Sequence, residues 1–481
     1  MNKPVEKIKG ITNFTNAGMN PDPRSGISKI EHFLVEKNLR PFHALVASDN
    51  TVGGTTPNAR LKKATKGNGK LYAIGVDPAS SPTPYLFEWN TSTFQWNGAG
   101  TFGSSGSAAD VVHYYSTADK IYGLWKGTHL WQMTTTGTFN GTYQALTYTY
   151  YADMITHSLD GIMYIATDNK ISKLDNTTFT SGALTLPTNF RITSISEQGI
   201  YLNIVGYDVN SGVSTSYQWD RDSSLTTLSQ KYNLGSSIAV HNAELNKQMF
   251  FVCIKQNSSQ TPFDERPVMK IKYISGDRIL TKDEFSFQSL TLLGGGKWIE
   301  DDKLYFTALV KFDGDSASKN VVFCLDYLGN LTIAQNAAIN TSSSVSAGVI
   351  RDGDGFWIFG GSDGSWHSTT TYSTESSIET KKESSENYGE RIELVGMTIM
   401  SDALPSGANI TVYARTDSTD TWSTLYTFST QSSIRNVFTL RELTTALQPA
   451  KELQFKIVST GGAVINSWQY KLRYLPVEKY S

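Results

Sequence analysis

One short phrase recurs seven times along this 481-residue chain: a turn pair, then an alternating strand with an aromatic or large apolar residue near its start. The seven strands read LYAIGV, IYGLWK, IMYIAT, IYLNIV, QMFFVC, LYFTAL and FWIFGG. The second residues of the turn pairs fall at 70, 120, 161, 199, 247, 303 and 355, so successive copies are 50, 41, 38, 48, 56 and 52 residues apart. Each interval can hold four short strands with turns, which is the blade of a β-propeller.

The sequences on either side of each repeat also fit a four-stranded blade. A shorter apolar strand precedes most copies, and a third strand follows most of them, at 85–90, 129–134, 170–175, 215–220, 269–274 and 321–326. A lone four-stranded blade cannot cover both of its apolar faces, whereas a closed ring of blades covers them. The sequence therefore predicts an all-β chain with a seven-bladed β-propeller. The alternative, one large sandwich of hairpins, is disfavoured by seven copies in phase.

The remaining segments give the domain boundaries. Residues 1–40 are expected to lead into the first blade, and the stretch ISKIEHFLV (27–35) to close the ring as an extra strand on the last blade. The propeller is expected over 41–373, and the charged, serine-rich stretch 374–391 is interpreted as a linker or an exposed edge strand. From 392 to 481 the period-2 pattern returns in six or more strands, which predicts a jelly-roll-like antiparallel β-sandwich.

Composition excludes several classes of protein. The net charge of -2 provides no field that would draw the chain to nucleic acid or membrane. Segment 1–12 lacks the apolar region of a secretory signal, and no apolar run has the length of a membrane span, so we expect a soluble protein made in a cytoplasm. Cys253 and Cys324 lie in apolar runs and read as small core residues.

A glycosidase or sialidase is the first enzyme class to test on a propeller, because it needs paired carboxylates or an arginine cluster. The segment Ser362-Asp363-Gly364-Ser365-Trp366 resembles the end of the Asp-box turn of sialidases, but it occurs once, and a hairpin turn explains it equally well.

The histidines do not form a catalytic or metal-binding motif. No HxH, HExxH or Cys–His spacing occurs, so neither a zinc site nor a nucleophile–base pair is supported. His113 and His157 recur near the ends of strands that precede repeat copies, where packing or a hydrogen bond to a turn is the expected role. The seven histidines are His32, His43, His113, His129, His157, His241 and His367.

Two charged clusters leave alternatives open. Acidic turns hold Asp313 with Asp315 and Asp352 with Asp354, which could ligate one structural calcium but are also ordinary tight-turn chemistry. A basic cluster could contact phosphate, but a solvated loop is the preferred interpretation, because no aromatic residues interleave with it. That cluster is Arg60, Lys62, Lys63, Lys66 and Lys70. No phosphate-binding glycine motif supports a nucleotide.

Two stretches resemble the β-propeller proteins of tailed-bacteriophage virions, of the tail nozzle, hub or tail-tip kind. The first is RSGISKIEHFLVEKNLRPF (24–42), and the second is 392–425. In the second stretch, the residues that match the pattern of those proteins are Leu404, Pro405, Gly407, Val412, Tyr413, Arg415, Asp417 and Trp422. The resemblance implies a subunit of the virion tail that assembles with copies of itself, as a homo-oligomer, and with other tail or neck proteins. It transfers no functional residue.

The leading hypothesis is thus a non-enzymatic structural component of a virus particle, with no catalytic, cofactor-binding or metal-binding residues and no cofactor. A second hypothesis is a receptor- or carbohydrate-binding protein that recognises a host-surface glycan, with Trp96, Trp366 or Trp422 stacking on sugars. A glycoside hydrolase or lyase acting through Asp363 is the third.

Overall fold

The computed structural model is all-β, with two short 3₁₀ turns, η2 (Ser116–Ala118) and η3 (Leu440–Glu442), in the part of the chain that it describes. Its contacts divide the chain into two compact units, 46–329 with 337–367, and 1–45 with 330–336 and 368–481. Strand pairing assigns 331–336, 365–372 and 43–47 to propeller sheets, so the propeller and the C-terminal module are described below by their sheets. The described residues are 5–11, 35–37, 43–47, 60–76, 84–90, 95–101, 111–125, 127–135, 138–222, 228–255, 266–311, 317–336, 348–352, 355–359, 365–372, 376–380, 382–384, 390–416, 421–443 and 447–475.

Seven four-stranded sheets make up the propeller, and each is a meander of neighbouring antiparallel strands. We number the blades in chain order. They are blade 1, β4 (Arg60–Gly67), β5 (Lys70–Val76), β6 (Pro84–Asn90) and β7 (Gln95–Thr101); blade 2, β8 (Val111–Tyr115), β9 (Lys120–Trp125), β10 (His129–Thr134) and β11 (Phe139–Ala145); blade 3, β12 (Tyr151–Thr156), β13 (Met163–Thr167), β14 (Lys170–Asp175) and β15 (Thr178–Thr185); blade 4, β16 (Phe190–Gln198), β17 (Tyr201–Asp208), β18 (Ser214–Trp219) and β19 (Leu228–Gly235); blade 5, β20 (Ile238–Leu245), β21 (Gln248–Lys255), β22 (Val268–Ser275) and β23 (Arg278–Ser286); blade 6, β24 (Ser289–Glu300), β25 (Lys303–Lys311), β26 (Lys319–Asp326) and β27 (Leu331–Asn336); and blade 7, β28 (Gly348–Asp352), β29 (Gly355–Phe359), β30 (Ser365–Tyr372) and β3 (His43–Ala47).

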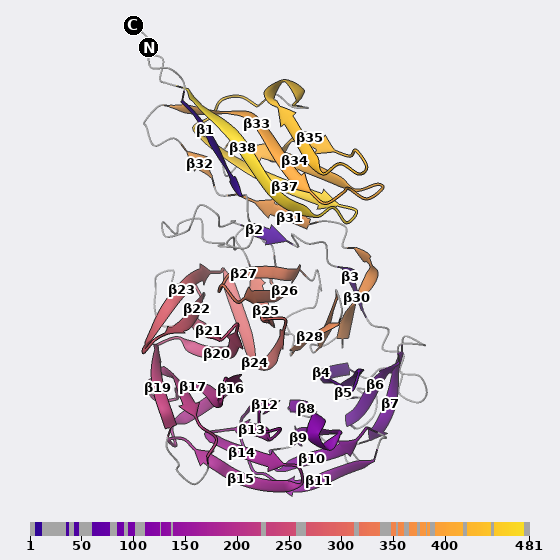
Figure 1. Cartoon of the computed structure of the whole chain (residues 1–481), viewed down its shortest axis with the longest axis vertical. Helices are drawn as coiled ribbons and strands as arrows, with labels where there is room; N and C mark the ends of the chain where they lie inside the picture. The colour runs from indigo at the N-terminus through magenta and orange to yellow at the C-terminus, as the bar shows by residue number, and fades with distance from the viewer. Residues whose placement is uncertain are drawn as a thin grey trace. The chain divides into compact units, whose positions relative to one another are not determined.

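The first strands of the blades close a ring. Strands β4, β8, β12, β16, β20, β24 and β28 contact one another in that order, and β28 also contacts β4. Figure 1 shows these strands nearest the centre, with the other strands of each blade radiating outward. The predicted seven-bladed propeller is confirmed, and each repeat copy of the sequence is the second strand of its blade.

Alternation along the second strands explains why they are apolar on both sides. In β5, Leu71 and Ala73 belong to an apolar cluster with Ile350 of blade 7, whereas Tyr72 and Ile74 join a different cluster with blade 2. Successive side chains of a strand point to opposite faces, so one strand contributes to both interfaces of its blade. Each second strand is therefore buried on both faces, which explains why the repeated sequence consists mainly of apolar residues.

The strand that completes blade 7 differs from the predicted one. The structure adds β3 (His43–Ala47) to β30, so an N-terminal strand does complete the last blade, but it lies after 27–35. Residues 27–34 lie outside the described residues. Val35 instead opens β2 (Val35–Lys37), which pairs with β31 (Ser376–Glu379).

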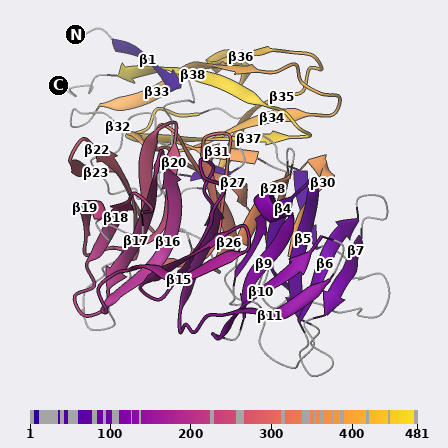
Figure 2. The same cartoon turned by 60° about the horizontal axis from the view of Figure 1, so that its bottom comes forward.

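The C-terminal module is a sandwich of two sheets. One sheet has the order β1 (Val5–Ile11), β38 (Ile465–Leu475), β33 (Arg391–Ser401) and β36 (Arg435–Thr439). The other has the order β2, β31, β37 (Glu452–Thr460), β34 (Asn409–Arg415) and β35 (Ser423–Phe428), with β32 (Glu383–Ser384) also paired to β37. Figure 2 shows the two sheets as separate layers. One buried apolar cluster draws residues from both sheets, among them Leu394, Phe438 and Leu472 from the first and Val412 and Phe455 from the second.

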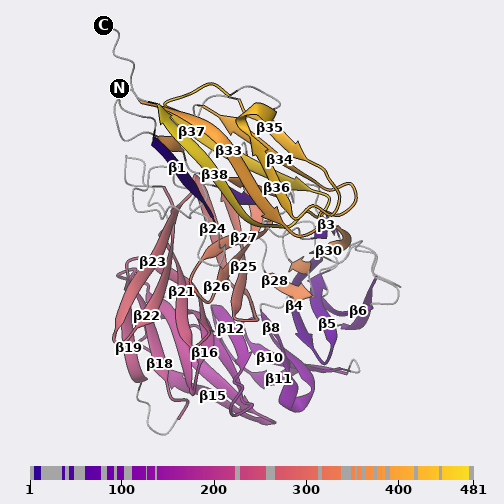
Figure 3. The ribbon, with the colours of Figure 1, turned by 45° about the horizontal axis from the view of Figure 1, so that its top comes forward.

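The strand order is that of an eight-stranded jelly roll. When β1, β31, β33, β34, β35, β36, β37 and β38 are numbered 1 to 8 along the chain, the sheets read 1-8-3-6 and 2-7-4-5. The first strand, β1, comes from the N-terminus and lies beside β38 (Figure 3). In sequence, the propeller is therefore inserted between the first and second strands of the jelly roll.

This arrangement departs from the predicted domain boundaries. Segment 1–40, predicted as a lead-in, contributes strands β1 and β2 to the sandwich. Segment 374–391, predicted as a linker or an exposed edge strand, contributes strands β31 and β32 to it. These strands are short and carry charged residues, so they lack the apolar residue pattern by which the blade strands are recognised. In β1, for example, Glu6 pairs with Lys471 and Arg473 of β38.

Candidate functional site in the propeller axis

Irregular pairing along the first strands places polar side chains in the propeller axis. In five blades the pairing of the first strand with the second shifts register, and the residue directly after the shift is Lys63, Asp153, Ser194, His241 or Lys297. A β-bulge adds one residue to a strand and re-aims the side chain that follows it. The bulges therefore turn polar side chains into positions that an unbroken strand would fill with apolar residues.

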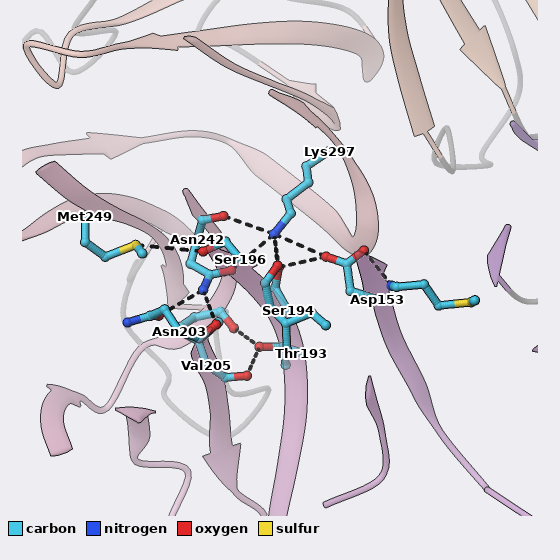
Figure 4. Close-up of polar contacts among 12 residues, drawn as sticks. Asp153, Thr193, Ser194, Ser196, Asn203, Val205, Asn242, Met249 and Lys297 are labelled. Carbon is cyan, nitrogen blue, oxygen red and sulfur yellow. Dashed lines mark hydrogen bonds and ion pairs between the residues drawn. The ribbon is translucent and has the colours of Figure 1, made fainter. Parts of the chain in front are cut away.

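Lys297 of β24 joins four consecutive blades through its ammonium group. The group donates to Ser194 Oγ at 2.6 Å and to the Ile195 carbonyl at 2.6 Å, both on β16. It also meets the Asn242 carbonyl at 3.0 Å and Asn242 Oδ1 at 3.2 Å on β20. Asp153 Oδ2, on β12, lies 3.1 Å away. Figure 4 shows these contacts converging on Nζ, and we call this arrangement the lysine brace.

The carboxylate of the brace makes two further contacts. Asp153 Oδ2 accepts a second hydrogen bond, from Ser194 Oγ at 3.3 Å, and Oδ1 accepts the Met154 N–H at 3.1 Å. The two charged side chains expose 7% and 13% of their surface, so the pair is almost dry. Burial lowers the pKa of Lys297, and the charge and hydrogen bond of Asp153 oppose that shift. An ammonium group has three N–H donors and here faces five oxygens, so it holds strands together and has no donor left for a substrate.

Further polar groups extend the brace to β17 and β18 of blade 4. Asn242 Nδ2 donates to the Asn203 carbonyl at 3.0 Å and to Asn203 Oδ1 at 2.9 Å. Ser216 Oγ donates to the same Oδ1 at 3.1 Å. Thr193 Oγ1 donates to the Ala239 carbonyl of blade 5 and lies 3.2 Å from the Val205 carbonyl. Because buried polar groups cost free energy when unpaired, this network fixes the mutual position of the blades that it joins.

A cavity of about 110 Å³ lies beside the brace, between the first strands of blades 1, 2, 3, 6 and 7. Its polar lining includes Lys63, Thr65, His113, Asp153 and Lys297. His113 contacts Thr156 Oγ1 at 2.8 Å through Nε2. Burial lowers the pKa of His113 to about 4, against the opposing charge of Asp153, so the imidazole is neutral at pH 7. The cavity is large enough for a few water molecules or one small polar ligand.

His241 is the most unusual polar group of the axis. It is fully buried, its ring lies 5.4 Å from that of Phe306, and neither ring nitrogen has a hydrogen-bond partner among the described residues. Burial, followed by the charges of Lys297 and Lys63, lowers its pKa to about 3. The imidazole is therefore a neutral core residue.

Carboxylates and carbonyls of the first hairpins, which join the first and second strands of the blades, link neighbouring blades. We call this chain of contacts the hairpin belt. From blade 2 to blade 7 it comprises Thr117 Oγ1 to the Gly161 carbonyl (2.9 Å), Ser158 N to Glu197 Oε1 (2.6 Å), Gly199 N to Glu244 Oε2 (2.7 Å), Asn246 N to Asp302 Oδ1 (2.9 Å) and Arg351 Nη1 to Asp301 Oδ2 (3.0 Å). These acidic groups hold backbone N–H groups and one guanidinium.

The sequence-predicted residues fall in several places. The basic cluster lies on β4 and β5, not on a loop: Lys63 lines the axial cavity and Lys70 pairs with Glu88 at 2.7 Å. The strand was missed because its Lys, Thr and Gly residues are typical of turns. His157 behaves as predicted, since its Nδ1 accepts the N–H of Leu159 in the following turn. His113 does not bond a turn but reaches the next blade.

Other candidates are only partly described. Asp313, Asp315, Asp354, Asp363 and Gly364 lie outside the described residues, so the calcium site and the Asp-box turn remain predictions. Trp422 is half-buried, with the Arg415 guanidinium 4.4 Å from its ring centroid. The side chains of Trp96 and Trp366 are not described. Cys253 is buried in the core as predicted, Cys324 is half-buried, and neither cysteine forms a disulfide bond.

Sequence reasoning missed Lys297 and Asp153. The available signal was LLGGGKWIE, where three glycines and a lysine interrupt an apolar strand, because glycine inside a strand often marks a bulge. Among the described residues, no three His, Cys, Asp or Glu side chains gather as metal ligands. Within the same residues, no helix has the length and apolar character of a membrane span.

Neither protein-family models nor curated proteins match this chain. Among solved structures it is similar to the N-terminal domain of Nup159, at 13% identity and a TM-score of 0.39, over 70% of this chain and 93% of that one. It is also similar to a protein from Lactobacillus plantarum, at 12% identity and a TM-score of 0.39, over 59% and 85%. The β-propeller domain of Cps50 (Swd1) from Myceliophteria thermophila gives 9% identity and a TM-score of 0.43, over 66% and 98%. With TM-scores below 0.5, the propeller assignment rests on the strand order given above.

Proposed function

We propose that this chain is a non-enzymatic structural subunit of a virus particle, which acts in a bacteriophage tail through protein–protein interfaces. The observation that carries the non-enzymatic part is the saturation of the lysine brace. Catalysis by a buried lysine requires a free amine or a free N–H donor at the reacting atom, and Lys297 spends its three donors on five oxygens of its own chain.

The rigidity of the ring supports an architectural role. The brace joins blades 3 to 6 and the hairpin belt joins blades 2 to 7, so blades 2 to 7 are held together by polar contacts as well as by apolar clusters. A rigid propeller offers two faces and a rim on which other subunits can assemble. The virion assignment draws on the resemblance of 24–42 and 392–425 to tail proteins, and it implies that copies of the chain meet each other and other tail or neck proteins.

Two experiments test the two parts separately. Mass spectrometry of purified particles should find the chain at a fixed copy number, and its absence from intact particles would overturn the virion assignment. Reductive methylation of the folded protein, mapped by mass spectrometry, should modify the half-exposed Lys70 and leave Lys297 unmodified. Fast modification of Lys297 would show an accessible amine and reopen the enzymatic alternative.

A further inference from the structure

Two neighbouring tyrosines are exposed on the propeller where the chain passes from blade 2 to blade 3. Tyr150 exposes 45% of its surface and Tyr151 exposes 39%. Val209, on the turn between β17 and β18 of blade 4, is 54% exposed. Large apolar side chains usually gain free energy from burial, so exposed aromatic residues held in one place suggest a contact surface.

The segment that carries Tyr150 is fixed to blade 3 by hydrogen bonds. The Asp168 carboxylate accepts the Tyr150 N–H at 2.7 Å and the Thr149 N–H at 3.0 and 3.1 Å. In return, the Asp168 N–H donates to the Tyr150 carbonyl at 2.8 Å. The backbone on both sides of the ring is thus ordered before any ligand binds, which lowers the entropic cost of binding.

Arg191 of blade 4 covers one face of the Tyr150 ring. Its guanidinium carbon lies 3.3 Å from the ring centroid, and Nη1 donates to the Tyr207 hydroxyl at 3.4 Å. Tyr150 stays 45% exposed with this guanidinium over its ring, so part of the residue remains accessible to a ligand. The guanidinium edge and the Tyr207 hydroxyl place polar groups beside an apolar ring. We call Tyr150, Arg191 and Tyr207 the tyrosine platform.

The charges around the platform select the class of ligand. The Asp168 carboxylate lies at the Tyr150 N–H, and Asp208 directly follows Tyr207, the register partner of Arg191. Backbone N–H groups of Ser211 and Asn210 lower the pKa of Asp208 and keep it ionised. Two carboxylates against one guanidinium leave no surplus positive charge, so a polyanion such as nucleic acid or an acidic polysaccharide is disfavoured. A pyranose ring has an apolar C–H face and a rim of hydroxyls, which match an aromatic face with donors and acceptors beside it.

We propose that the tyrosine platform binds a neutral glycan, with one hexopyranose unit stacked on the exposed part of Tyr150 and its hydroxyls hydrogen-bonded to Arg191 and Tyr207. This site goes beyond the structural role proposed above and does not depend on it, because a tail subunit without a glycan site and a glycan-binding propeller outside a virion are both possible outcomes.

Saturation-transfer NMR and titration calorimetry of the full chain with maltohexaose, cellohexaose and a β-1,3-glucan hexamer test the site. We expect binding of at least one of them, weakened about tenfold by Tyr150→Ala and within about threefold of the parent for Tyr150→Phe. Tyr327→Ala is the matched control, since Tyr327 is 41% exposed on blade 6. It should leave binding unchanged.

Four outcomes would overturn the proposal. They are no binding of any neutral oligosaccharide at millimolar concentration, binding that Tyr150→Ala leaves intact, equal loss in Tyr327→Ala, and tighter Tyr150-dependent binding of polygalacturonate than of every neutral probe. Circular dichroism of each variant separates loss of the site from loss of the fold. Particle mass spectrometry remains a separate readout, so failure of the glycan site leaves the virion assignment standing.

Discussion

The two units of this chain bury apolar surface in different ways. In the jelly roll, one buried cluster is shared by both sheets. In the propeller, separate clusters lie between neighbouring blades, such as one between blades 1 and 2 and another between blades 3 and 4. A single core resists local change as a whole, whereas a ring of small interfaces depends on each of them. The polar brace and belt lie in the unit whose apolar core is divided.

The largest expected effect is therefore the loss of the brace. Lys297→Met leaves the Asp153 carboxylate buried without its partner and should destabilise the propeller by about 3–5 kcal/mol. Lys456→Met in the sandwich is the matched control. Lys456 and Glu379 form a looser pair, 3.8 Å apart with about a fifth of each side chain exposed, so the cost should stay below about 1 kcal/mol.

Native-state hydrogen exchange read by mass spectrometry reports the two units separately, which a single unfolding curve of a two-unit chain does not. A double variant, Lys297→Met with Asp153→Asn, removes both charges and should recover part of the loss. Equal costs for Lys297→Met and Lys456→Met would show that the propeller depends on its brace no more than the sandwich depends on the Lys456–Glu379 pair.

Acid should weaken the propeller more than the sandwich. The pKa of His241 is about 3 when folded and about 6.5 when unfolded, so the unfolded chain binds more protons between these values and stability falls as pH drops through that window. At pH 5 the cost is about 2 kcal/mol. His113, whose pKa is about 4, adds in the same direction, but it lines the cavity and we expect less from it.

Exchange rates at pH 7 and pH 5, corrected for intrinsic exchange, measure this effect. His241→Met should flatten the pH dependence of the blade 5 peptides. The sandwich strands from 391 to 475 contain no histidine and should keep their protection over the same range. Equal acid sensitivity of both units would exclude His241 as its source.

Removing β1 should affect the sandwich alone. Deletion of residues 1–11 takes away seven register pairs with β38 and should destabilise the sandwich by about 2 kcal/mol, since each cross-strand pair contributes a few tenths of a kcal/mol. Peptides of β38 should exchange faster, and those of blades 2 to 5 should not change. A sandwich that keeps its full protection without β1 would contradict the jelly-roll assignment of this strand.

How much of this could be read from the sequence depends on what each strand buries. Second strands such as β21 (QMFFVC) are covered on both faces, so their sequences are apolar. For this reason the ring of seven blades could be predicted. Strand β1 (VEKIKGI) is an edge strand with a charged outer face, and nothing in seven residues reveals a partner more than 450 positions away. The jelly roll was thus predicted from its later strands without its first one.

The candidate site was harder to predict than the fold for a related reason. Asp153 stands in YADMIT, where alternation would assign it to solvent, and only the bulge turns it inward to Lys297. The position of a bulge depends on pairing with the next strand, which local text does not specify. Charged residues that a register shift buries therefore cannot be predicted from the sequence until the strand pairing is known.

The smallest expected effect concerns the hairpin belt. Glu197 accepts the Ser158 N–H at 2.6 Å and the Ser158 hydroxyl at 2.7 Å, so it ties blade 3 to blade 4 near solvent. Glu197→Gln keeps one acceptor and the size of the side chain, but replaces a charged acceptor by a neutral one, and should cost about 1 kcal/mol. Glu452→Gln, at a 2.8 Å surface pair with Lys382 in the sandwich, should cost less.

Hydrogen exchange of the blade 3 and blade 4 hairpin peptides measures the effect of Glu197→Gln. If these hairpins keep their protection in Glu197→Gln, the belt contributes nothing to the ring, and the brace with the apolar clusters accounts for the union of these blades.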